Sequence, residues 1–75
     1  MSNWNKKIEH PTYGDVLLIK DRDDRLFWIT FFFKIGDEMY NFDSLTLTNE
    51  GVRDALFDSI DLDFIKTLFE QLNIE

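Results

Sequence analysis

The sequence predicts an α+β fold, a two-layer sandwich in which an antiparallel four-stranded β-meander is followed by two C-terminal α-helices (ββββαα). Apolar residues alternate with a period of two through the first part of the chain and then recur with the 3.6-residue period of a helix. Turn sequences separate the extended runs, and the 75 residues contain no Gly/Ser-rich linker and no internal repeat. We therefore expect a single domain over residues 1–75.

Two extended runs predict the first hairpin. A weak strand near Trp4 to Glu9 precedes a stronger one over Asp15 to Asp21. The segment Pro11 to Gly14 lies between them and carries the Pro and Gly that suit a type I turn. The charged segment Arg22 to Arg25 is expected to form the next loop tip.

The segment from Leu26 to Ile35 is the clearest strand, because β-branched and aromatic residues dominate it. Alternate side chains point to opposite faces of a sheet. The predicted core face carries Phe27, Ile29, Phe31, Phe33 and Ile35. The opposite face carries Leu26, Trp28, Thr30, Phe32 and Lys34.

The fourth strand is predicted over about Glu38 to Thr46, after Gly36-Asp37, which places Gly first as a type II′ hairpin turn prefers. Its apolar residues fall into two alternating phases, Tyr40 and Phe42 in one and Leu45 and Leu47 in the other. A β-bulge near Asp43-Ser44 would turn both sets toward the same side.

Two amphipathic helices follow the strands. Thr48 or Asn49 can cap a helix over about Glu50 to Ser59. Its predicted apolar face carries Val52, Ala55, Leu56 and Ile60. Asp61 is a second N-cap, and the apolar stripe of the next helix comprises Leu62, Phe64, Ile65, Leu68, Phe69 and Leu72. We expect both helices to cover the core face of the sheet.

The residue types that enzymes need are scarce. His10 is the one imidazole and precedes a proline in a turn, which is typical of a strand-end residue, and the chain has no cysteine. The three glycines form no phosphate-binding loop. Asp21 to Asp24 superficially resembles a calcium loop but lacks the mid-loop glycine. We expect no enzymatic activity, no catalytic residues, no metal site and no cofactor.

Acidic residues are concentrated in the second half of the chain. The net charge is −7 overall, made up of +1 in residues 1–36 and −8 in residues 37–75. A chain of this charge should not bind nucleic acid directly. No apolar run approaches the roughly 18 residues of a membrane span, and the first residues form no evident export signal. We expect a cytoplasmic protein that does not enter a membrane.

The position of the acids indicates a binding surface. Glu50, Asp54 and Asp58 recur at i, i+4 and i+8, which places them on one side of the first helix, and Asp61 and Asp63 continue the stripe. Asp37, Glu38 and Asp43 are expected to flank it. A row of carboxylates can occupy a basic groove that otherwise binds phosphates. The predicted partner is therefore a protein with a basic surface, such as a nucleic-acid-binding or defence protein.

In its small size, strong acidity and lack of catalytic groups and cysteine, the chain resembles the class of phage-encoded inhibitors that includes anti-CRISPR and DNA-mimic proteins. That resemblance implies a non-enzymatic inhibitor that blocks its partner. An ordinary solvated surface would also be acidic, and the alternative function is a structural or accessory subunit. That subunit would dimerise or dock through Leu26, Trp28 and Phe32, unless Trp4 and Ile8 of the N-terminal segment, or a strong twist of the sheet, cover this face.

Overall fold

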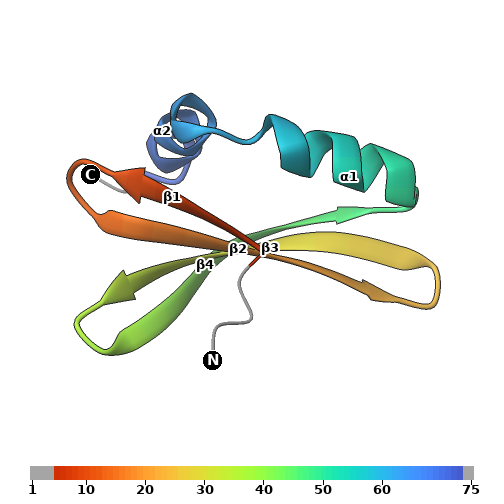
Figure 1. Ribbon diagram of the computed structural model, residues 1–75, viewed down its shortest axis with the longest axis horizontal. Helices are drawn as coiled ribbons and strands as arrows, with labels where there is room; N and C mark the ends of the chain where they lie inside the picture. The colour runs from red at the N-terminus through yellow and green to blue at the C-terminus, as the bar shows by residue number, and fades with distance from the viewer. Residues whose placement is uncertain (1–4, 74–75) are drawn as a thin grey trace.

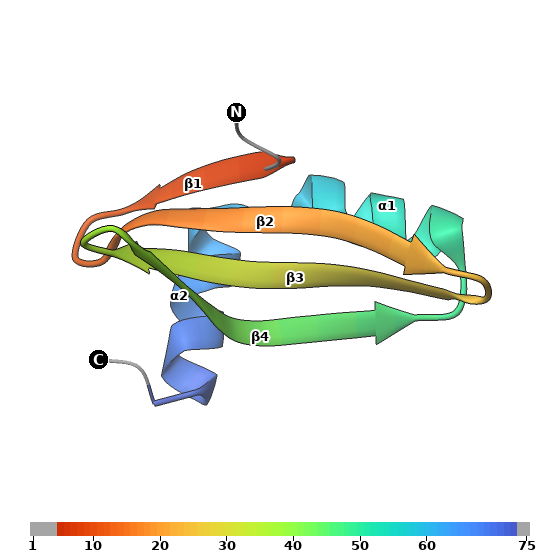
Figure 2. The same ribbon diagram turned by 90° about the horizontal axis from the view of Figure 1, so that it is seen from below.

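The computed structural model describes residues 5–73, and within them the predicted meander and helices are confirmed. Antiparallel strands form one sheet in the order β1-β2-β3-β4. Both helices lie on the same face of this sheet, and β4 forms one of its edges (Figures 1 and 2). The elements are β1 (Lys6–His10), β2 (Gly14–Asp23), β3 (Leu26–Ile35), β4 (Glu38–Leu47), α1 (Glu50–Ser59) and α2 (Leu62–Gln71).

The three hairpin turns depend on residues with positive φ. Gly14 (φ 78°) ends the first turn, and Gly36 (φ 62°) begins the last one, as the predicted turn requires. The middle turn is tighter than the predicted loop of residues 22–25, because Asp23 still pairs with Leu26. Asp24 adopts φ 49° to allow this, a conformation that Asp tolerates better than most residues.

A bulge in β4 confirms the phase change predicted for this strand. Phe31 pairs with Asp43 whereas Phe32 pairs with Asn41, so that Phe42 is the extra residue. The ring of Phe42 lies 5.0 Å from that of Phe33. The bulge therefore turns both halves of β4 toward the helices.

The core lies between the sheet and the two helices. Ile29 and Phe31 of β3 are fully buried there, as predicted, while Phe27 and Phe33 are only half-buried. The prediction for Ile35 was wrong, since its side chain is 57% exposed. Ile35 ends β3, where the twisted hairpin of β3 and β4 turns away from α2 (Figure 1). The core cluster comprises Val16, Leu18, Ile29, Phe31, Phe57, Ile60, Ile65, Leu68 and Phe69.

Helix α1 is rotated relative to the apolar face predicted from its sequence. Its side chains buried in the structure are Arg53 and Phe57, whereas Val52 is 54% exposed and Ala55 is also exposed. The predicted face was therefore wrong apart from Leu56, which is half-buried, and Ile60, which is buried just beyond the helix. The physical reason is that Arg53 forms polar contacts with the sheet, described below, which hold the helix in this orientation.

Helix α2 uses the predicted apolar stripe. Ile65, Leu68 and Phe69 are buried, although Leu72 at the helix end is exposed. Phe69 is the centre of an aromatic cluster at one end of the sheet. Its ring lies 5.0 to 6.2 Å from four other rings, those of His10, Tyr13, Phe33 and Phe42.

Candidate protein-binding surface

The acidic residues predicted to bind a partner do not form one continuous surface. Asp37 and Glu38 lie at the β3–β4 turn, whereas α1 begins just beyond the other end of β4. Ten strand residues separate these points, which corresponds to about 30 Å at the usual rise per residue. Asp43 lies between them, half-buried beside the bulge. The remaining acids follow α1 into the α1–α2 junction and are Glu50, Asp54, Asp58, Asp61 and Asp63.

The first part of this helical stripe is neutralised by the chain's own bases. Arg53 donates from Nε to Oδ1 of Asp54 over 2.8 Å, and its Nη2 lies 3.5 Å from Oε2 of Glu50. Lys20 of β2 lies 3.8 Å from Asp54, and Arg22 lies 3.8 Å from Glu50. Glu50 and Asp54 are therefore ion-paired within the molecule.

Arg53 is the residue that holds this arrangement together, and the sequence prediction did not include it. Its side chain is 6% exposed, and Nη1 donates to the backbone carbonyl of Asp21 over 2.8 Å. The guanidinium also lies 5.6 Å from the centre of the Phe27 ring, within the range of a cation–π interaction. The spacing of Glu50 and Arg53 at i and i+3 was the available sequence signal.

The acids at the α1–α2 junction differ from Glu50 and Asp54. Asp58, Asp61 and Asp63, which we call the junction acids, are exposed, and no base within residues 5–73 forms an ion pair with them. Asp61 caps α2, because its Oδ1 accepts a hydrogen bond from the backbone N–H of Phe64 over 3.0 Å. The junction acids thus present three carboxylates to solvent.

Lys6 of β1 binds the end of α1 rather than the junction acids. Its Nζ donates to the carbonyl oxygens of Phe57 and Ile60 over 2.6 and 3.0 Å. Both carbonyls lie at the C-terminal end of α1, where that of Phe57 also accepts a hydrogen bond from the backbone N–H of Ile60, and a cation there stabilises the helix dipole. Lys6 therefore fixes the position of the α1–α2 junction against the sheet.

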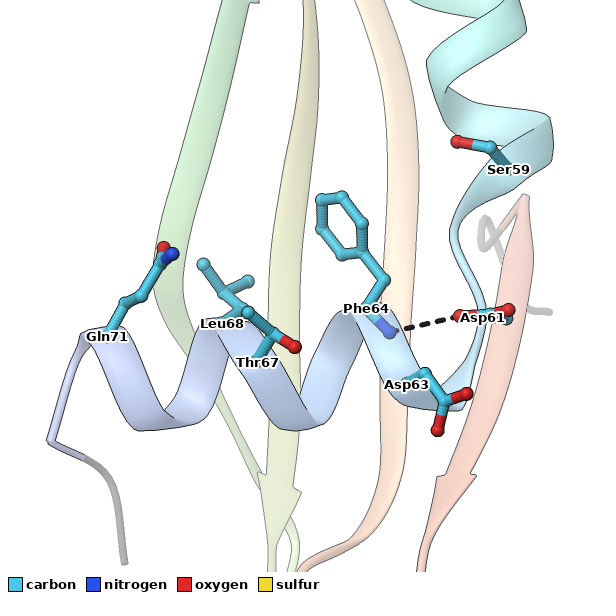
Figure 3. A pocket seen from close by; sticks show the side chains of 7 residues that line it. All are labelled: Ser59, Asp61, Asp63, Phe64, Thr67, Leu68 and Gln71. Carbon is cyan, nitrogen blue, oxygen red and sulfur yellow. Dashed lines mark hydrogen bonds between the residues drawn. The ribbon is translucent and has the colours of Figure 1, made fainter.

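A pocket of about 390 Å³ opens beside the junction acids. Figure 3 shows Phe64, Leu68 and Gln71 projecting from α2 toward the side on which Ser59 of α1 lies. Two of the junction acids lie at the pocket, which is lined by Ser59, Asp61, Asp63, Phe64, Thr67, Leu68 and Gln71. The pocket thus combines apolar surface with carboxylates, hydroxyls and an amide, and none of the basic residues within positions 5–73 lines it.

The acidic turn at the far end of the sheet has a local role in the structure. The hydroxyl of Tyr40 donates a hydrogen bond to Oε2 of Glu38 over 2.5 Å. This bond, and to a lesser extent desolvation, raises the pKa of the Tyr40 phenol above its usual value near 10. Glu38 is therefore engaged within the turn.

The sheet face opposite the helices is less exposed than its composition indicated. Leu26 is 44% exposed, but Trp28 and Phe32 are half-buried. Leu17 lies beside Phe32 on the same face and is only 5% exposed. Ile8 packs against the helix-side core, so it does not cover this face, and Trp4 lies outside the described residues.

His10 is engaged in the first turn. Its Nδ1 accepts hydrogen bonds from the backbone N–H groups of Thr12 and Tyr13 over 3.0 and 3.2 Å. Among residues 5–73, no three His, Asp or Glu side chains are placed to hold a metal ion. Neither α1 nor α2 is long and apolar enough to cross a membrane.

Comparisons of the chain with protein families, with curated proteins and with solved structures found no match. Function is therefore inferred from the geometry and charge of this chain alone.

Proposed function

We propose that this chain is a small non-enzymatic binding protein that inhibits a partner by covering the partner's basic surface. The contact is made by the junction acids. The observation that supports this proposal is the difference between the two parts of the acidic stripe: Glu50 and Asp54 pair with the chain's own bases, whereas the junction acids are exposed and pair with no base among the residues that the structure describes.

The arrangement of the junction acids favours binding over a general solubilising role. Asp61 and Asp63 stabilise the N-terminus of α2, but Asp58 lies in the last turn of α1, where a negative charge opposes the helix dipole and costs a little stability. A cationic partner removes that cost. The adjacent pocket adds apolar surface to the charged one, and interfaces that combine a polar rim with an apolar centre bind most effectively.

Inhibition would follow from competition. A protein that handles nucleic acid binds phosphates with arginine and lysine side chains, and carboxylates presented by a folded domain can occupy the same side chains. This is the mode of action of a DNA mimic, and we place the chain among anti-defence inhibitors of the phage-encoded, anti-CRISPR-like type that works in the cytoplasm. A net charge of −7 opposes direct binding of nucleic acid by the chain itself.

The test uses the wild-type chain and two variants of it as baits in one lysate of the host cells. In the first, Asp58, Asp61 and Asp63 are all changed to Asn. In the control, Glu9→Gln, Asp23→Asn and Asp24→Asn change three exposed acids elsewhere. Both variants shift the net charge from −7 to −4.

We expect the wild-type and control baits to retain the same basic protein, and the junction variant to lose it. The captured protein should be released by added DNA or RNA if the two compete for one surface. Retention of the same proteins by all three baits would contradict the proposal.

A second candidate function is an accessory subunit that dimerises or docks through the sheet face opposite the helices. It is favoured by the exposure of Leu26 on a face that neither helix covers. Trp28→Ala would then abolish assembly, and reversing the charges of Asp54 and Asp58 would leave function intact. Sedimentation of the purified chain as a monomer at micromolar concentration would exclude an obligate dimer.

A further inference from the structure

We propose that the pocket between the end of α1 and α2 receives an arginine side chain of the protein partner. The inference rests on the proposed function for the identity of the molecule that carries the arginine. The chemistry of the pocket itself is independent of that identity and is set by the residues that line it.

The size of the pocket suits a single long side chain. Its volume of about 390 Å³ lies near the lower end of the range of about 300–1,000 Å³ that is usual for ligand sites. A helix or a strand of a partner would not enter it. One side chain projecting from a partner surface can enter while the surface itself rests on the junction acids.

The charge of the pocket selects a cation. Asp61 and Asp63 are among the residues that line it, and no basic residue of the described part of the chain does so. One oxygen of Asp61 is used to cap α2, which leaves its other oxygen available. An anionic or purely apolar group in the pocket would displace water from these carboxylates without pairing with them. The lost hydration of the unpaired charges would weaken its binding.

The remaining lining residues favour arginine over lysine. The ring of Phe64 is stacked against Phe31 on one side and is only half-buried, so part of its surface is open for a planar guanidinium to pack against. A guanidinium has five N–H donors. The hydroxyl of Ser59 donates to the carbonyl of Leu56 over 2.7 Å, which leaves its lone pairs free to accept. Thr67 and Gln71 supply further acceptors.

The test uses N-acetyl-arginine N-methylamide as the probe and follows the backbone amides of the ¹⁵N-labelled chain by NMR. Two probes of similar shape serve as comparisons, the citrulline analogue, which is neutral, and the lysine analogue, which is charged but not planar. Shifts are expected at residues 59–71. The arginine probe should bind about fivefold or more tightly than either comparison, because charged bidentate hydrogen bonds are the stronger ones.

Two variants with the same change in charge locate the site. Asp63→Asn alters the lining of the pocket and should weaken binding of the arginine probe about fivefold. Asp58→Asn alters a junction acid that does not line the pocket, and it should change binding less than about twofold. Asp61→Asn also alters the lining of the pocket, and asparagine can still cap α2. It replaces Asp63→Asn in the binding measurement if that variant fails to fold.

Equal binding of the citrulline or lysine probe would overturn the inference, as would equal effects of Asp63→Asn and Asp58→Asn. These results are separate from those that test the proposed function. If the junction variant loses the captured protein but the arginine probe does not bind, the proposed function stands and the pocket assignment fails. If the probe binds as expected but all baits retain the same proteins, the pocket assignment stands and the proposed function fails.

Discussion

Replacing Arg53 with methionine tests whether one buried cation holds α1 on the sheet. Methionine keeps most of the apolar stem but loses every polar contact. The hydrogen bond to the Asp21 carbonyl is worth about 1.5–3 kcal/mol as a bond from a charged group. The pairs with half-exposed Glu50 and Asp54 add about 0.5 kcal/mol each, and the contact with Phe27 adds about 0.5–1 kcal/mol.

Part of this sum is offset, because burying a methionine avoids the cost of desolvating a guanidinium. We therefore expect a net loss of about 2 kcal/mol in the free energy of unfolding, which corresponds to a fall in Tm of about 10 °C for a domain of this size. Circular dichroism at increasing temperature and urea unfolding would measure it. Lys66→Met is the control, since Lys66 is exposed on α2 and forms no ion pair within residues 5–73. A loss for Arg53→Met as small as that of the control would show that the polar contacts of Arg53 do not hold α1 on the sheet.

Three further predictions follow from single contacts. Asp61→Ala should cost about 1 kcal/mol, or about 5 °C in Tm, because α2 loses its cap, whereas Asp61→Asn should cost less than half of that. Phe69→Ala should cost about 3–5 kcal/mol and largely abolish the cooperative thermal transition, because the ring is buried among four others. The raised pKa of Tyr40 means that its bond to Glu38 stabilises the fold below about pH 10 and that this contribution is lost as the pH rises through the pKa. Absorbance titration at 295 nm should show the pKa of Tyr40 falling in Glu38→Gln.

The strands and helices could be predicted because local periodicity encodes them. The fourth strand is the clearest case. The phase change between Phe42 and Leu45 required a bulge, and the structure places the extra residue at Phe42. The end of β3 could not be predicted in the same way. Whether Ile35 is buried depends on how far the helices extend over a twisted sheet, and alternation within one strand carries no such information.

The candidate site was only partly predictable for a related reason. The sequence placed Glu50, Asp54 and Asp58 on one side of a helix, but it did not indicate which of them would be neutralised. The local spacing of Arg53 was one signal, but Lys20 and Arg22 of β2 reach Asp54 and Glu50 only through the fold of the sheet. The pocket is lined by residues from the end of α1 and from α2, and no local pattern specifies how the two helices are placed relative to each other.

Contact of the junction acids with a cationic surface is the step on which the proposed inhibition depends. Its most direct test is the dissociation constant of the captured partner at salt concentrations from about 0.05 to about 0.5 M, for the wild-type chain and for the junction variant. We expect the wild-type affinity to fall about tenfold or more over this range. The junction variant should bind more weakly and with little dependence on salt. Equal salt dependence in the two chains would show that the junction acids do not make this contact.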